Sequence, residues 1–142
     1  MSSHQKITED FHTGAQVGEA DFEKLAAAGF KSVINNRPDD EEPGQLDHER
    51  AAAAAERAGL AYRYVPVSPT SIGEEDVESF ARALEELPKP VFAHCRSGMR
   101  STALWALSQV SERGIDDVMG RAAAAGYDLS ALRSRLESRQ QA

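Results

Sequence analysis

Apolar residues along the chain form two alternating patterns, short continuous runs and stripes at helical spacing. The runs are bounded by turn residues and predict strands, whereas the stripes predict helices. Strands are expected at 11–17, 30–35, 60–67 and 91–93, and helices at 19–28, 46–58, 74–87, 100–112, 116–125 and 129–137. Strands that alternate with helices favour an α/β fold. We therefore expect one domain over residues 1–142, with a mostly parallel central sheet of four or five strands flanked by helices.

The apolar run at 91–93 is typical of a strand buried at the centre of a sheet. The polar segment 95–101 follows it directly, and the next helix is expected to begin near residue 100. In open parallel sheets, ligands bind beyond the carboxyl ends of the strands. The pattern therefore places Cys95 where a ligand is expected.

Composition narrows the possible partners. The formal net charge of −7 argues against nucleic acid as the main partner, because phosphate backbones attract basic surfaces. No apolar run reaches the roughly 20 residues that span a bilayer, and the N-terminal residues lack the pattern of a signal peptide. We therefore predict a cytoplasmic protein that binds neither nucleic acid nor membrane. A local cationic pocket can still attract a small anionic substrate to an acidic protein.

Cys95 is the only cysteine, which excludes an internal disulfide and a metal site built on several thiolates. No metal and no other cofactor is expected. The residues around Cys95 suit a nucleophilic thiolate, the reactive form of cysteine. The N–H groups of the following helix favour negative charge, and Arg96 and Arg100 bring two cations close in sequence. Gly98 would let the backbone turn its amides inward to form a nest for an anion.

The remaining loop residues receive supporting roles. Ser101 is placed to donate its hydroxyl proton to the Cys95 sulfur, and Ser97 and Met99 complete the anion-binding loop. His94 is expected to order the loop rather than act as a base, because consecutive strand side chains point apart.

Each of these residues also has a purely structural interpretation. Arg96 would be a solvated charge, Arg100 the ion-pair partner of an acidic side chain on the helix, and Ser101 a helix N-cap. Gly98 would simply mark a turn. Both sets of interpretations stay open at this point.

Residues 7–112 resemble the phosphatase-like domain family associated with beta-lactamase hydrolase-like proteins, a family similar in fold to the dual-specificity tyrosine phosphatases. The stretches that carry the resemblance are 13–16, 29–41, 64–67 and 94–101. The resemblance implies a cysteine-phosphatase-like fold and a link to sulfide and persulfide metabolism, sometimes beside a metallo-hydrolase-like domain. That domain's His-rich motif is absent here, so we expect a separate persulfide-metabolising partner enzyme or action alone. The helices expected over 115–138 lie outside the resemblance.

The loop spacing departs from that of the tyrosine phosphatases, which place five residues between the cysteine and the arginine. Here four residues, 96–99, separate Cys95 from Arg100. A shorter loop should shrink the cradle for the three equatorial phosphoryl oxygens. The spacing is instead similar to that of rhodanese-type sulfurtransferases, whose loop would suit one terminal sulfur atom. The leading hypothesis is thus a sulfurtransferase that passes sulfane sulfur through a Cys95 persulfide to an external thiol acceptor.

The expected general acid is also missing. Phosphatases of the resembling class carry an aspartate in a loop before the nucleophile, but the matching stretch 65–71 holds no acidic residue. Such an acid can contribute about 10²- to 10⁴-fold in rate. Asp39, Asp40 or Asp76 would substitute if folded over the pocket; otherwise they are turn or helix N-terminal residues.

Two further hypotheses stay open. One is a tyrosine or dual-specificity-like phosphatase that forms a Cys95 phosphocysteine. The other is an anion-binding or sulfide-sensing module without turnover.

Overall fold

A computed structural model describes residues 4–141 as an α/β fold built on a five-stranded sheet with the order β1-β2-β5-β3-β4. The strands are β1 (His4–Thr8), β2 (Phe11–Gly14), β3 (Ser32–Asn35), β4 (Ala61–Tyr64) and β5 (Val91–His94). β1 pairs antiparallel with β2, and all other pairs are parallel. The predicted α/β domain with a mostly parallel sheet is therefore confirmed, with β5 at its centre.

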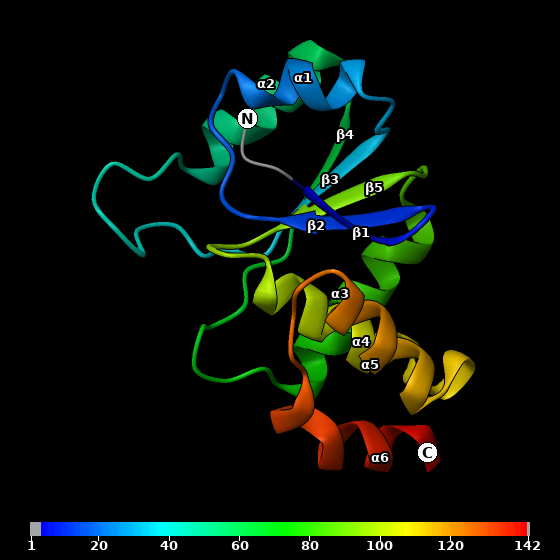
Figure 1. Cartoon of the computed structure of the whole chain (residues 1–142). Coiled ribbons are helices and arrows are strands. Elements are labelled where there is room, and N and C mark those ends of the chain that lie inside the picture. Colours follow the sequence, from blue (N-terminus) through cyan, green and yellow to red (C-terminus); the bar gives the residue numbers. More distant parts are fainter. Residues whose placement is uncertain (1–3, 142) are drawn as a thin grey trace.

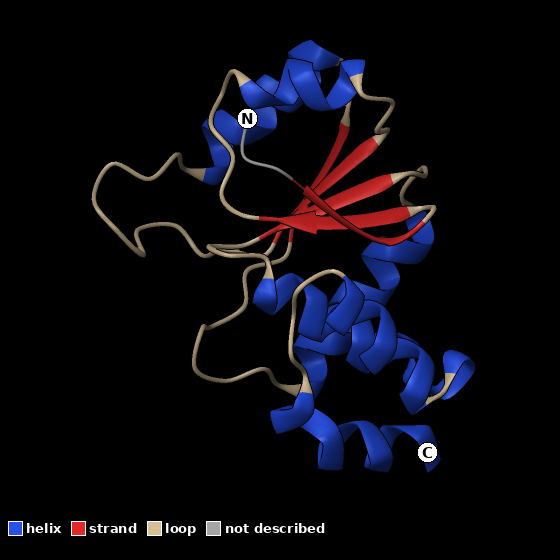
Figure 2. Cartoon of the chain, in the orientation of Figure 1, coloured by secondary structure: helices blue, strands red, loops and turns tan. Residues whose placement is uncertain are grey.

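Helices cover both faces of the sheet (Figures 1 and 2). One face carries α1 (Asp21–Ala27) and α2 (His48–Ala58). The other carries α3 (Glu74–Glu86), α4 (Met99–Arg113), α5 (Ile115–Ala124), a 3₁₀ turn (Ser130–Leu132) and α6 (Arg133–Gln141). No helix within residues 4–141 is both long enough and apolar enough to cross a bilayer.

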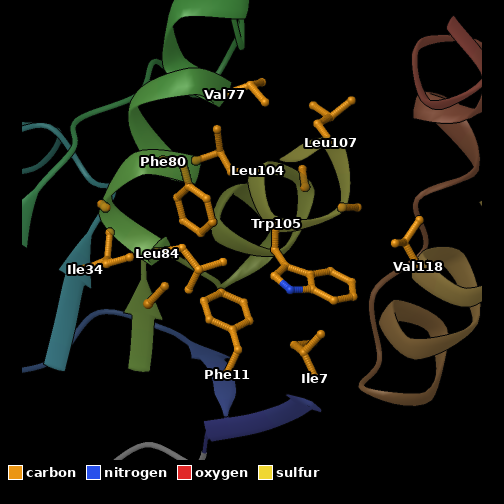
Figure 3. Packing of buried hydrophobic residues seen from close by; sticks show 14 of the residues in the cluster. Ile7, Phe11, Ile34, Val77, Phe80, Leu84, Leu104, Trp105, Leu107 and Val118 are labelled. Atoms are coloured by element: carbon orange, nitrogen blue, oxygen red, sulfur yellow. The ribbon is translucent and has the colours of Figure 1, made fainter. Parts of the chain in front are cut away.

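The larger part of the core lies between the sheet and α4 (Figure 3). Trp105 of α4 stacks on Phe11 of β2 with the ring centroids 6.1 Å apart, and Phe11 meets Phe80 of α3 edge to face at 5.9 Å. Every residue from Ser101 to Leu107 is buried, because α4 packs against the sheet, α3, α5 and α6. The N-terminus of α4 is consequently held in a fixed place beside the end of β5.

The strand β1 lies outside the sequence prediction. Its residues are mostly polar, and only Ile7 enters the core. As an edge strand, β1 is held by the backbone ladder to β2, which leaves little hydrophobic pattern to recognise. The predicted strand over 60–67 also ends earlier, at Tyr64, although Val65 and Val67 still donate backbone hydrogen bonds to Asn35 and Asn36.

Candidate functional site

Three parallel strands end side by side at the cysteine loop. His94 at the end of β5 is in register with Gly14 of β2 and Asn35 of β3. Backbone hydrogen bonds continue past the strands: Cys95 N–H donates to the Gly14 carbonyl at 3.4 Å, and Asn36 N–H donates to the His94 carbonyl at 2.8 Å. The segments that follow β2 and β3 therefore flank the loop, as expected for a site at the carboxyl edge of a parallel sheet.

The Cys95 sulfur is enclosed at the N-terminus of α4. Cys95 is 1% exposed, and the Gly98 N–H donates to its Sγ atom at 3.1 Å. A backbone donor and the positive end of a helix both stabilise a negative charge on this sulfur. This arrangement is compatible with the nucleophilic thiolate expected from the sequence.

Tyr127, which follows α5, packs over the loop. Its hydroxyl donates to the Ser97 carbonyl at 3.4 Å. A Cβ atom added to Gly98 would lie 2.1 Å from the Tyr127 hydroxyl oxygen, and Gly98 has a φ of +98°. Glycine is thus required here both by conformation and by space. No sequence motif marks Tyr127, because its role depends on α5 returning to the loop.

Arg100 lies in the first turn of α4 and is already paired. Its Nη1 donates to Glu41 Oε2 at 2.9 Å and to the Val67 carbonyl at 3.0 Å, and its Nη2 donates to Glu41 Oε1 at 3.1 Å. The interpretation of Arg100 as an ion-pair partner is correct for this conformation. The acid comes from the loop after β3, however, and not from the helix itself.

A second arginine, absent from the sequence prediction, reaches the same carboxylate. Arg37 donates from Nε to Glu41 Oε1 at 2.9 Å and from Nη1 to Gln16 Oε1 at 3.2 Å, with its side chain 1% exposed. Partial burial alone would raise the pKa of Glu41. The hydrogen bonds from Arg100 and then Arg37 outweigh that effect and hold the pKa below its ordinary value.

Ser101 occupies a different position from the one expected. Its hydroxyl donates to Asn36 Oδ1 at 2.8 Å, so its proton is not directed to the Cys95 sulfur. The reason is the end of β3, which brings Asn36 against the first turn of α4. Asn36 in turn donates to the Val65 carbonyl at 2.9 Å. Ser101 therefore ties the loop to the chain that follows β3 and β4.

The other loop side chains face outward. Arg96 is 69% exposed and lies 3.9 Å from Glu42, and Met99 is 37% exposed. Ser97 accepts a hydrogen bond from the Met99 N–H at 3.3 Å. The solvated interpretation of Arg96 thus describes this conformation, and the group that reaches the Cys95 sulfur is the Gly98 amide rather than one of these side chains.

The candidate acids have structural partners. Asp39 accepts from the His48 backbone at 2.9 Å and pairs with its ring at 2.5 Å, while Asp40 is exposed with a φ of +66°. Asp76 accepts from the Gly73 N–H at 2.7 Å, at the start of α3. Among the described residues, no hydrogen bond or ion pair joins these three to the cysteine loop. The carboxylates that reach this region are Glu41, which binds Arg100, and Glu42, which lies 3.9 Å from Arg96; neither is among the predicted site residues.

Comparisons with known proteins place the fold and the sequence beside one family. The profile of one family, the phosphatase-like domain of beta-lactamase hydrolase-like protein, matches residues 3–112. The beta-lactamase hydrolase-like protein of Xylella fastidiosa (strain 9a5c) is 41% identical over 133 residues, which cover 92% of this chain and 31% of that protein. The chain spans under a third of the length of the curated relatives it matches.

Solved structures support the same family resemblance. A crystal structure from Neisseria meningitidis Z2491, described as a candidate phosphatase, is 36% identical with a TM-score of 0.84 and covers 95% of this chain and 96% of that one. The structure of Tk-PTP in the active form has a TM-score of 0.74 at 19% identity, covers 98% of this chain and 96% of that one, and shows likeness of fold alone. The predicted cysteine-phosphatase-like fold is therefore confirmed.

The contact at Gly98 generates the first prediction. An alanine in the left-handed conformation of Gly98 costs about 1–2 kcal/mol. We expect Gly98→Ala to lower the free energy of unfolding by more than this amount, because Tyr127 or the loop must also move. Gly44→Ala is the matched control, since Gly44 has a φ of +81° and nothing lies within 4 Å of its added Cβ. Urea denaturation measures both losses. Equal losses would contradict the packing role of Gly98.

His94 generates the second prediction. Burial lowers its pKa from 6.5 to about 4; a backbone contact with Cys95 opposes this shift and the charge of Arg37 adds to it. The unfolded chain therefore binds the proton more readily below pH 6.5, so the free energy of unfolding should fall by about 3 kcal/mol as pH falls from about 7 to below 4.

The matched variant is His94→Gln, which removes this titration and leaves the other acid-sensitive groups in place. Urea denaturation across that pH range should give a shallower decline for the variant than for the wild type. Parallel declines would show that His94 does not carry the effect.

Proposed function

Because the chain belongs to the phosphatase-like domain family of beta-lactamase hydrolase-like proteins, we propose that it is a cysteine-dependent phosphatase. The observation that carries the proposal is the enclosed Cys95 sulfur, which receives the Gly98 amide beside Arg100 at the N-terminus of α4. The substrate class is a small phosphoester or phosphotyrosine. The curated relatives are more than three times as long as the matched segment, so the proposal concerns this chain alone.

The reaction follows from the atoms at the loop. The Cys95 thiolate attacks phosphorus, the ester P–O bond breaks, and the phosphoryl group becomes bonded to sulfur. Water then attacks the phosphocysteine, which releases inorganic phosphate and restores the thiolate. In this proposal the Gly98 amide and the Arg100 guanidinium offset the charge on the phosphoryl oxygens.

The acids bound elsewhere restrict the substrate. Asp39 is engaged by His48 and Asp76 by Gly73, so neither is placed to protonate a leaving group. A leaving group that departs as a weakly basic anion needs less help from a general acid. We therefore expect aryl phosphates to react faster than alkyl phosphates.

A second candidate function is sulfur transfer, which the four-residue spacing between Cys95 and Arg100 favours. In this reaction the thiolate attacks the sulfane sulfur of thiosulfate, the S–S bond breaks, and sulfite leaves. An external thiolate then takes the outer sulfur from the Cys95 persulfide. The comparisons with known proteins give no support to this chemistry, so it ranks behind phosphate hydrolysis.

Hydrolysis of p-nitrophenyl phosphate tests the phosphatase proposal. Cys95→Ser should abolish turnover, and Arg100→Lys should lower kcat/KM by about 10²-fold because a lysine lacks the bidentate fork. Arg63→Lys is the control, since Arg63 pairs with Glu86 on the surface of β4. Acid quenching of the wild type should trap a phosphate on Cys95. Absence of turnover between pH 5 and 8 would refute the proposal.

Mass spectrometry after incubation with thiosulfate or glutathione persulfide tests the second candidate. Sulfur transfer requires the added mass of one sulfur atom on Cys95, lost on addition of a thiol and absent from Cys95→Ser. An unmodified Cys95 would remove this candidate. Tight phosphate or sulfate binding without turnover of either kind would favour the anion-binding module.

A further inference from the structure

We propose that Arg37 and Arg100 form a two-arginine oxyanion site, that Glu41 is its internal ligand, and that the substrate anion takes the place of the Glu41 carboxylate. The inference deepens the proposed function by naming a dianionic oxyanion as the group recognised. It rests on that function only in treating Arg100 and the cysteine loop as the reacting site.

The guanidinium groups of Arg37 and Arg100 converge on one carboxylate. Arg37 Nε and Arg100 Nη2 both donate to the same atom, Glu41 Oε1, at 2.9 and 3.1 Å, and Arg100 Nη1 donates to Oε2 at 2.9 Å. Two cations directed at one oxygen define a position for an anion. Arg100 cannot present this end of its guanidinium to a substrate while Glu41 occupies it.

The two arginines and Glu41 are largely buried. The side chains of Arg37, Arg100 and Glu41 are 1%, 10% and 16% exposed. Of the acids near the two arginines only Glu41 is enclosed with them; Glu42 is 49% exposed and lies 3.4 Å from Arg37 Nη2. The arginines are therefore only partly neutralised within the enclosed group, and buried charge is costly unless paired. A dianion would neutralise both arginines, which a single carboxylate cannot do.

One nitrogen of Arg37 remains without a hydrogen-bond acceptor in the described part of the chain. Arg37 Nη2 is buried and makes no hydrogen bond within residues 4–141; the oxygen of its ion pair with Glu42 lies 3.4 Å away. A tetrahedral oxyanion has more oxygens than a carboxylate and offers this nitrogen an acceptor. The site as it stands is thus incompletely satisfied by Glu41.

The loop between β3 and α2 allows the exchange. It extends away from the body of the protein (Figure 1) and is anchored near its ends by Asp39 to His48 and by Gln45 to the Pro38 carbonyl. Between these anchors, Glu41 and Glu42 join the loop to the site through ion pairs with arginines. An incoming anion would therefore exchange the ion pairs between Glu41 and the two arginines for its own, without disturbing the core.

The test is binding of inorganic phosphate to the full chain, measured by isothermal titration calorimetry. Glu41→Gln keeps the side-chain shape and removes the competing charge, so it should lower the Kd for phosphate about tenfold or more. Arg37→Gln should raise that Kd by a similar factor. Glu86→Gln, which removes a surface partner of Arg63, should leave it unchanged.

An unchanged or weaker affinity in Glu41→Gln would overturn the inference and would mean that Glu41 only positions Arg100. The same holds if none of the variants binds phosphate. Because Arg37→Gln can fail to fold, circular dichroism is recorded for it, and Glu41→Gln decides the question alone. Tighter phosphate binding without hydrolysis of p-nitrophenyl phosphate would sustain this inference and refute the phosphatase proposal, so the two failures are distinguishable.

Discussion

The parallel alignment of β5 between β2 and β3 is the constraint from which the site is built. It brings the ends of three strands to one edge, where Gly14 receives the Cys95 amide and the His94 carbonyl receives Asn36. The burial of α4 against the same sheet fixes the other end of the loop. With both ends held, four residues suffice to turn the chain so that the Gly98 amide meets the sulfur at 3.1 Å. The shape of the loop therefore depends on the sheet more than on the loop side chains.

The sequence predicts features that involve neighbouring residues better than contacts between residues far apart in the chain. The central strand, the helix after Cys95 and the turn at Gly98 are local features, and hydrophobic patterning and turn chemistry reveal them. The partner of Arg100 lies 59 residues away and that of Ser101 lies 65 residues away. Neither partner leaves a local trace, because strand order decides which loops meet. The same reason explains why the sequence does not reveal the roles of Arg37 and Tyr127. The partner of Asp39, His48, is only nine residues away, but no motif marks the pair.

Glu41 and His94 differ in charge although both side chains are at least partly buried. Burial lowers the pKa of His94 to about 4 and keeps the ring neutral, and neither ring nitrogen has a hydrogen-bond partner within residues 4–141. Glu41 stays ionised despite partial burial, because two arginines hold its pKa low. The charge of Arg37, which adds to the effect of burial on His94, thus also helps to bind the Glu41 carboxylate. A site with that charge will select anions over neutral ligands.

The charge of Arg37 also bears on the choice between phosphorus and sulfur. A persulfide carries one charge on one terminal atom and would use the Gly98 amide of the loop. A persulfide would not need a contact with the second buried arginine, Arg37. A phosphoryl group distributes two charges over several oxygens and can engage Arg37 and Arg100 together, at the position where their hydrogen bonds now converge on Glu41 Oε1. The loop is one residue shorter than that of the tyrosine phosphatases, and under the proposed two-arginine site Arg37 supplies additional donors to the anion. The spacing that favours sulfur when the loop is considered alone is therefore compatible with phosphate once Arg37 is included.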